Sequence, residues 1–297
     1  MSEAKTEPTA SEPRYLYYRV YCPDGAIPSK TAFNPRNPYV GRILAKSIPP
    51  PHNATTLKRC LLRTENLTDP HGQRTQLYRD HDARSHLAGT DRVGIFGPVA
   101  DGATPDSALA LVLRDYLSAD EKATVARIDL SCPGEEEPKY LYYRLFTDTG
   151  EDVSKVSFNL NEPSLGRVER NLISPPHSPP TIRRYIAKVE GRPIYTYSEF
   201  YQNISAQQAL KDNIYLPLAR VGLTQEDPIV LVQPKRQPGL YNRPVKIIFS
   251  PLFELFGGSL AYTDGVLQNN RYKCTYNNKS SYLSPGNIAF PRSWLDQ

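Results

Sequence analysis

An internal repeat is the feature of this sequence that most limits how the chain can fold. Residues 15–66 align without a gap on residues 140–191, at a constant offset of 125 positions, with 20 identities in 52 positions. Both copies open with Tyr-Leu-Tyr-Tyr-Arg and share a later Gly-Arg and a Pro-Pro-His. Because a repeated segment marks a repeated structural unit, one module is predicted to occur twice. We call residues 15–114 module 1 and residues 140–233 module 2.

The similarity weakens after residue 66 and then resumes in three short segments. The matched pairs are 77–78 with 200–201, 92–94 with 220–222, and 108–112 with 228–232. The repeat therefore covers about a hundred residues in each copy, which is an ordinary size for a domain.

The first part of each module is predicted to be a hairpin followed by a helix. Residues 15–21 alternate side chains with the period of a β-strand, turn residues follow at 23–25, and a second strand is expected to return through 30–33. Residues 56–62 place apolar side chains at i, i+3 and i+4, the spacing of an amphipathic helix, with Thr or Asn as its cap. A short strand at 77–78 and a final apolar strand complete the module, and module 2 has the same pattern.

This order of elements resembles the ubiquitin-like β-grasp fold. Residues 181–190, Thr-Ile-Arg-Arg-Tyr-Ile-Ala-Lys-Val-Glu, look like the ubiquitin helix. As in ubiquitin, they are followed by Gly191, a proline, an aromatic short strand and a closing apolar strand at 228–232. The resemblance covers about two thirds of the chain. It implies an α+β fold class, with two tandem ubiquitin-like β-grasp modules followed by a small β-rich C-terminal domain.

Two features depart from that family. Residues 37–51, and 162–176 in module 2, are an insertion between the hairpin and the helix. Family members that are joined to other proteins end in a Gly-Gly tail, whereas these copies run into Arg114-Asp115 and Gln233-Pro234, so conjugation is not expected. Tandem modules with Gly-Arg and Pro-Pro-His at fixed places are also similar to uncharacterised repeat modules of fungal proteins, a resemblance that implies no activity.

The segments outside the modules differ in composition and charge. Residues 1–14 are polar and are expected to be a disordered tail, and residues 115–139 form a charged linker with a strand at 124–130. Residues 234–297 hold eight basic and three acidic residues, a net of +5 that equals the formal charge of the whole chain. They are predicted to form a basic β-rich domain. Its expected elements are strands at 245–249, 271–276, 281–283 and 288–290 and a turn at 262–265.

Several classes of function have no support in the sequence. Phosphate-binding glycine loops, nucleophile motifs and zinc-protease motifs are absent, and the four cysteines, at positions 22, 60, 132 and 274, are too widely spaced for a zinc site. We therefore expect no catalytic residues, no metal and no cofactor. The sequence lacks a run of about 18 apolar residues and an N-terminal secretory signal. A cytoplasmic or nuclear protein that does not bind membranes is expected.

The outer face of the first strand is the predicted partner-binding site. Tyrosine and arginine concentrate at protein interfaces, because a large rigid ring with a polar tip binds at low entropic cost. The predicted residues are Tyr15, Tyr17, Arg19 and Tyr21 in module 1 and Tyr140, Tyr142 and Arg144 in module 2. The competing interpretation is that the inserted Gly-Arg-Ile-Leu-Ala-Lys-Ser-Ile-Pro-Pro-Pro segment, residues 41–51, covers this face in at least one module.

Two other sets of residues are candidate binding sites. A predicted C-terminal strand alternates basic and aromatic residues, as a platform for single-stranded nucleic acid would, although a solvated β-face is the commoner outcome. Its residues are Arg271, Tyr272, Lys273 and Tyr276.

His52 and His177 occupy matching positions before the helix. Since neither has a second histidine or a cysteine pair at ligand spacing, a structural role is favoured.

Duplication without catalytic residues favours a non-enzymatic protein-interaction adaptor or scaffold, with another protein as its partner. One alternative is a self-assembling structural protein, a homo-oligomer that pairs through β-edges. A further alternative is nucleic-acid binding through residues 234–297. The first 233 residues carry 28 basic and 28 acidic side chains, which gives no electrostatic support for nucleic-acid binding there.

Overall fold

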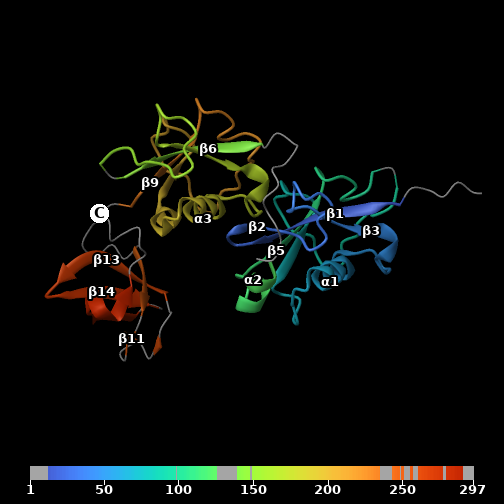
Figure 1. The fold of residues 1–297 in the computed structure, drawn as a ribbon, viewed down its shortest axis with the longest axis horizontal. Helices are drawn as coiled ribbons and strands as arrows, with labels where there is room; N and C mark the ends of the chain where they lie inside the picture. Colours follow the sequence, from blue (N-terminus) through green and yellow to red (C-terminus); the bar gives the residue numbers. More distant parts are fainter. Residues whose placement is uncertain are drawn as a thin grey trace, which may run out of the picture. The chain divides into compact units, whose positions relative to one another are not determined.

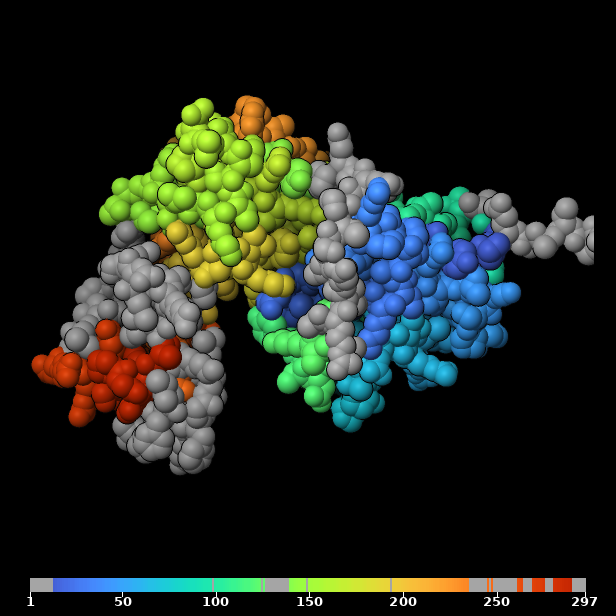
Figure 2. Space-filling model, in the orientation of Figure 1, coloured from blue at the N-terminus to red at the C-terminus, as the bar shows by residue number. Residues whose placement is uncertain are grey.

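The computed structural model describes residues 13–97, 99–125, 139–147, 149–234, 243–247, 249–250, 255–256, 260–276 and 279–289. The chain divides into two compact units; the first holds module 1 except for residues 23–25, and the second holds module 2. Figure 1 shows both modules as small sheets, each with a helix against it. In the space-filling view the side chains fill the spaces that the ribbons leave within each module (Figure 2).

Module 1 is built on a five-stranded mixed sheet. Strand β1 (Tyr15–Cys22) and strand β5 (Leu109–Leu113) lie parallel at its centre, although they come from the two ends of the module. Strand β4 (Thr75–Tyr78) is antiparallel to β5 on one side. Strands β2 (Gly25–Ile27) and β3 (Gly41–Leu44) both adjoin β1 on the other side. A 3-10 turn, η1 (Ala45–Ser47), follows β3.

Helix α1 (Ala54–Glu65) covers one face of this sheet. Its N-cap, Asn53, accepts a hydrogen bond from the backbone N–H of Thr56 at 2.9 Å, and its C-cap, Asn66, adopts a left-handed conformation with φ of 56°. Leu57 and Leu61 pack into the core with the inward side chains of β1 and β5. A second, shorter helix, α2 (Ala119–Val125), adds Val125 to that core.

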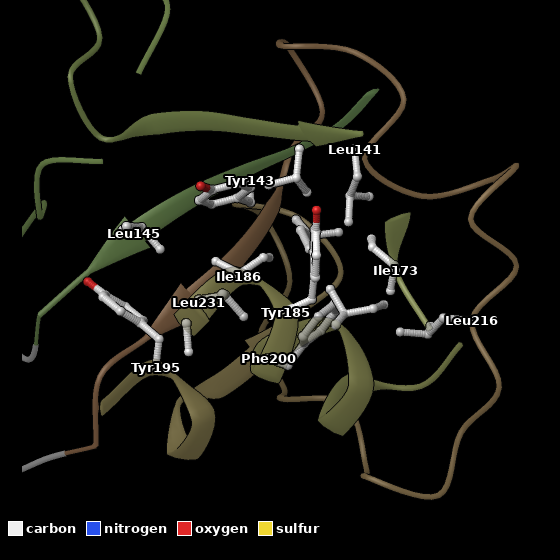
Figure 3. Close-up of a cluster of buried hydrophobic side chains, with 14 of the residues drawn as sticks. Leu141, Tyr143, Leu145, Ile173, Tyr185, Ile186, Tyr195, Phe200, Leu216 and Leu231 are labelled. Atoms are coloured by element: carbon white, nitrogen blue, oxygen red, sulfur yellow. The ribbon is translucent and has the colours of Figure 1, made fainter. Parts of the chain in front are cut away.

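Module 2 repeats this arrangement with four strands, in the order β7-β6-β9-β8. Strand β6 (Tyr140–Phe146) is parallel to β9 (Ile229–Val232), and β7 (Leu165–Glu169) and β8 (Glu199–Tyr201) are antiparallel to their neighbours. Helix α3 (Pro179–Glu190) covers one face, and the 3-10 turns are η2 (Arg170–Leu172) and η3 (Pro193–Tyr197). Figure 3 shows its core, where Ile186 of α3 lies among Leu141, Leu145 and Leu231 of the sheet.

The two modules share their strand register as well as their order. Tyr17 faces Arg42 in module 1, and Tyr142 faces Arg167 in module 2, 125 positions later in both strands. Leu77 faces Leu111 and Phe200 faces Leu231, which confirms the sequence pairing of 77–78 with 200–201.

The C-terminal residues form a separate antiparallel sheet in the order β15-β14-β13-β10-β16, with its own small core around Val245, Ile247 and Cys274. These strands are β10 (Arg243–Ile247), β13 (Leu260–Gln268), β14 (Arg271–Tyr276), β15 (Lys279–Leu283) and β16 (Ile288–Ala289). A two-stranded ribbon joins β11 (Phe249–Ser250) to β12 (Leu255–Phe256), and η4 (Pro285–Asn287) precedes β16. The predicted β-rich character of this segment is confirmed for the described residues.

Three local predictions are wrong. The strands that return along β1 are β2, at residues 25–27, and β3, within the supposed insertion, while residues 30–33 contribute only the isolated bridge from Ala32 to Gly41. Residues 124–125 end a helix, and the rest of the predicted strand at 124–130 lies outside the described residues. Strand β13 continues through 262–265, and the turn is formed by Asn269 and Asn270, both with positive φ.

One pairing in the repeat is also wrong. The backbone N–H of Val93 donates to the His52 carbonyl, and the equivalent donor in module 2 is Leu216, which donates to the His177 carbonyl. Likewise Tyr142 N–H donates to Gly222, but its counterpart Tyr17 donates to Gly102. Segment 92–94 therefore does not match 220–222. The local likeness of Arg-Val-Gly in the two copies is misleading because the connecting loops differ in length.

The mixed α+β class is confirmed by these sheets and helices. Within the described ranges, every helix is too short or too polar to span a bilayer.

Candidate interaction surface

A buried carboxylate anchors each module beneath the first strand. Glu65, at the end of α1, accepts hydrogen bonds from the hydroxyls of Tyr18 at 2.6 Å and Ser29 at 2.5 Å, and from the backbone N–H of Lys30 at 3.0 Å. The side chain is 5% exposed. Burial, and then the neighbouring Glu65 carboxylate, raises the pKa of Tyr18 far above its ordinary value, so its hydroxyl remains a donor. The network fixes the helix end, the strand and the following turn together.

Module 2 contains the same network with the same residue types. Glu190 accepts from the hydroxyl of Tyr143, from Ser154 Oγ at 2.6 Å and from the backbone N–H of Lys155 at 2.7 Å. The pKa of Tyr143 is raised by the same causes, burial first. The shared lysine of the sequence repeat thus contributes its backbone N–H, while the Lys30 and Lys155 residues themselves are exposed.

The repeated Gly-Arg is explained by this network and by the stack above it. A Cβ on Gly41 would lie 2.2 Å from Ser29 Oγ, and one on Gly166 would lie 2.5 Å from Ser154 Oγ. Only glycine therefore allows β3 and β7 to approach the buried tyrosine and serine. The arginine that follows each glycine points to the opposite face, because side chains alternate along a strand.

On that opposite face the arginine lies among aromatic rings. The guanidinium carbon of Arg42 is 4.2 Å from the ring centre of Tyr15 and 5.0 Å from that of Phe33. Tyr17 meets Phe33 edge-to-face with ring centres 5.2 Å apart. We call Tyr15, Tyr17, Phe33 and Arg42 the aromatic stack of module 1. Cation–π contacts of this kind hold the rings in a fixed arrangement.

Module 2 has a matching aromatic stack, formed by Tyr140, Tyr142, Phe158 and Arg167. Arg167 lies 4.2 Å from the centre of the Tyr140 ring and 4.6 Å from that of Phe158. The rings of Tyr142 and Phe158 are 5.6 Å apart. The four residue types, their order and these contacts recur in both modules, and all eight side chains are half-buried. Module 2 has one further ring contact, between Tyr140 and Tyr142.

The structure divides the predicted partner-binding residues into two groups. Tyr15, Tyr17, Tyr140 and Tyr142 are half-buried and belong to the stacks, but Arg19 and Tyr21 are buried, with 5% and 0% exposure. Tyr21 packs with Tyr78, Ala110 and Val112 in a small cluster of its own. The exposed surface that was predicted on this strand of module 1 is therefore limited to Tyr15 and Tyr17.

The inserted segment covers part of this face, as the competing interpretation expected. Its cover is Arg42, the second residue of the 41–51 segment, which lies on Tyr15. The neighbouring Phe33, which precedes the segment, was missed as a site residue. A signal for it was present in the sequence, because Phe33 and Phe158 are identical at matching positions of the repeat.

Arg144, the last predicted residue of module 2, is half-buried and neutralised by two glutamates. Its guanidinium donates to Glu162 and, at 3.3 Å, to Ser164 Oγ, and it lies 3.7 Å from Glu151. Phe146 and these glutamates line a shallow pocket of about 260 Å³ next to it.

In the C-terminal sheet the predicted basic and aromatic residues lie on opposite faces. Tyr272 packs against the core beside Cys274, while Arg271 is exposed and Lys273 half-buried. Since successive side chains of a strand point to opposite sides, Tyr272 is not on the face of the predicted basic platform. The side chain of Tyr276 lies outside the described residues. Tyr282 on β15, which was not predicted, pairs with Lys273 across the strands and is 46% exposed.

The two histidines have backbone roles. The carbonyls of His52 and His177 accept the bonds from Val93 and Leu216 noted above, which tie the helix entrance to the long loop. His52 Nε2 lies 3.2 Å from the Ile48 carbonyl, and His177 is buried. This placement agrees with the structural role that the sequence favours.

Comparison with protein-family models and with curated proteins found no match for this chain.

Proposed function

We propose that this chain is a non-enzymatic protein-interaction scaffold made of two ubiquitin-like β-grasp modules, each of which presents its aromatic stack to a protein partner. The main support for this proposal is that the stack occurs in both modules. The Tyr-Tyr-Phe-Arg set has the same arginine–ring and Tyr–Phe contacts in both modules, and it leaves large rings half-exposed. Rings held in advance by a guanidinium lose little freedom on binding, which makes them effective contact residues.

The strand order supports the β-grasp part of the proposal. The first and last strands of each module are parallel neighbours at the centre, a short strand lies outside the last one, and one helix crosses a single face. The β-grasp fold has this order. The long connection between β1 and β3 would be the departure from it, with the Gly-Arg strand formed inside that connection.

The scaffold hypothesis is tested by substituting the stacks without disturbing the buried networks. The double variant Tyr17→Ser and Tyr142→Ser removes one ring from each stack, and we expect it to lose the cross-linked protein partners that wild-type chain forms in cells, identified by mass spectrometry. Tyr116→Ser is the matched control, because Tyr116 is 52% exposed and lies outside both stacks. Unchanged cross-links in the double variant, with unchanged far-UV circular dichroism, would refute the assignment.

A second candidate function is binding of single-stranded nucleic acid by the β14–β15 hairpin. Lys273 and the exposed Tyr282 face each other across the two strands, on the side where Arg271 projects. A base could stack on the ring while the basic groups meet phosphates. Tyr282→Ser should then weaken retention of single-stranded RNA at low salt, whereas Tyr116→Ser should not. Retention that is independent of salt would exclude this function.

Self-assembly is the remaining proposal, and it relies on the edges of the module sheets. In the strand orders of the module sheets, the end strands are β2 and β4 in module 1 and β7 and β8 in module 2. Unpaired strand edges can join between chains. A mass from light scattering that stays at the monomer value as concentration rises would exclude it.

A further inference from the structure

The same arginine of the first strand has a different environment in each module. Arg19 and Arg144 are equivalent, 125 positions apart, on the outer face of β1 and β6. Arg144 is held by the Glu162 carboxylate and lies near Glu151. Arg19 is more deeply buried, and its Nη1 has no hydrogen-bond partner within the described part of the chain.

The difference follows from two substitutions in the repeat. The position of Glu162 is occupied in module 1 by Asn37, and that of Glu151 by Ala26. The backbone is the same, since the N–H of Asn37 donates to Asn34 at 3.0 Å and that of Glu162 donates to Asn159 at 3.1 Å. Module 1 therefore keeps the turn that supplies the carboxylate in module 2 but lacks the carboxylate.

A third substitution changes the neighbour of the guanidinium across the sheet. On the neighbouring parallel strand, Arg19 is opposite Ala110, whereas Arg144 is opposite Val230. The smaller side chain in module 1 removes two methyl groups from the outer face next to the arginine. Both changes, less bulk and no acid, leave Arg19 without the neighbours that surround Arg144 in module 2.

We propose that Arg19 is a binding site for a carboxylate of an acidic partner segment, one that carries aspartate or glutamate side chains. Module 2 shows what fits, because there the equivalent guanidinium binds a glutamate from the chain itself. A buried charge without a partner is costly, by several kcal/mol in general. A carboxylate that arrives on a flexible side chain supplies the missing acceptor and matches the planar geometry of arginine.

The Arg19 site rests on the proposed scaffold function, because Arg19 lies on the same strand face as Tyr15 and Tyr17 of the stack. The partner of module 1 would then place a ring or apolar group on the stack and an acidic group on Arg19. Module 2, with its arginine already neutralised, would bind a partner without that acidic group. The two modules would therefore differ in the charge of the segment that they prefer.

The test uses the full chain and a blocked tri-glutamate peptide, N-acetylated and C-amidated. We expect the peptide to shift the arginine side-chain ¹H–¹⁵N resonances of Arg19 and not those of Arg144. The variant Asn37→Glu, which installs the acid of module 2, should weaken peptide binding by about tenfold or more, the loss expected for a charge-assisted hydrogen bond. Asn37→Gln is the matched control of equal length without charge, and it should bind the peptide as the wild type does.

The reverse experiment creates the site in module 2. In the double variant Glu162→Gln and Glu151→Gln, Arg144 loses both acids, and its resonances should now respond to the peptide. No response of Arg19 at about 20 mM peptide, a concentration that saturates even a millimolar site, would overturn the proposal. A larger shift of the Arg19 resonances with inorganic phosphate than with the peptide would overturn the assignment to a carboxylate.

An acid within module 1 is the competing occupant, and it is tested separately. Asp80 also has a buried carboxylate oxygen without a partner in the described residues. If Asp80→Asn and Arg19→Gln lower stability equally, and the double variant loses no more than either one, Arg19 is neutralised within the chain and the proposal fails. In that case the double variant Tyr17→Ser and Tyr142→Ser would still lose its cross-links. Failure of the acidic site and failure of the scaffold function are therefore distinguishable.

Discussion

The two modules differ in how they pack one region, which we call the corner. There the segment that follows the first strand, the residue that follows the helix and the end of the last strand meet. In module 1 the corner is apolar: Ile27, Leu67 and Leu113 pack with Leu117 and with Val125 of α2. In module 2 the three equivalent positions are polar and converge on one carboxylate. Asp152 accepts from Arg192 at 2.5 Å, from Gln233 at 2.9 Å and also from the Tyr195 hydroxyl at 2.5 Å.

The positions correspond in the backbone as well as in the sequence. Leu67 N–H donates to Leu62 at 2.9 Å, and Arg192 N–H donates to Ala187 at 2.9 Å, directly after the helix in both modules. An apolar corner has to be covered, and α2 covers it. A polar corner satisfies its own hydrogen bonds, and an added helix is not required. The Glu–Tyr–Ser network and the aromatic stack therefore define the shared module, whereas the corner and the surroundings of Arg19 and Arg144 differ between the two copies.

The largest predicted effect concerns the part that the modules share. Glu65→Ala and Glu190→Ala each leave buried donors without an acceptor, and each should destabilise its own module by about 3 kcal/mol. Hydrogen exchange resolved by residue measures the two modules separately. The comparison predicts equal losses, and Lys46→Ala, an exposed residue, should cost almost nothing. A large loss in only one module would mean that the network is not equivalent in the two.

A smaller effect is expected at the corner, and only in module 2. Asp152→Ala removes the acceptor of three side chains, and module 2 should lose about 2 kcal/mol while module 1 is unchanged. The matched change in module 1, Ile27→Ala, deletes buried apolar groups instead and should expose amides of α2 to exchange. If Asp152→Ala leaves exchange in module 2 unaltered, the polar corner does not stabilise that module.

The smallest effect is a pH dependence in module 1. Arg74 donates to Glu121 at 2.7 and 2.9 Å, and this pairing lowers the pKa of Glu121 to about 2, from an ordinary value of 4.5. A carboxylate with a lowered pKa stabilises the folded form above its ordinary pKa, and that contribution is lost as pH falls from about 4.5 towards 2.

Protection of the α2 amides should therefore decrease over that interval, by about 1 to 2 kcal/mol. Glu121→Gln should remove the dependence and leave α2 less protected at neutral pH. The amides of α3 serve as the internal control, because that helix belongs to the module without this ion pair. Protection of α2 that is flat between pH 5 and pH 2 in the wild type would contradict the prediction.

The sequence predicted the elements whose periodicity is strong, and it failed where the contacts are between distant segments. The first strand, the helix and the closing strand of each module all follow from spacing. Strand β3 was missed because only four residues pair and their alternation is too short to recognise. The Tyr15 and Tyr17 part of the site was found from residue type, but the alternation places Arg19 on the same face and does not show that Arg19 is buried.

The buried glutamates were missed although a signal existed. Glu65 follows Leu57 and Leu61 at steps of four, on the face that packs into the core, and it is identical in both copies. An acidic residue at the end of a helix is usually solvated, and that general expectation concealed the exception.

The parallel pairing of β1 with β5 sets the order in which a module can be completed. The first strand has its central neighbour some ninety residues later in the chain, so the sheet cannot close until residues 109–113 have been synthesised. Contacts between segments so far apart slow folding, because the loop between them must be closed first. In a nascent chain that ends before residue 109, the edge of β1 that pairs with β5 is open, and the equivalent edge of β6 in module 2 is filled only when residues 229–232 have emerged. The central pairing of each module is therefore completed last during translation, when its final strand is available.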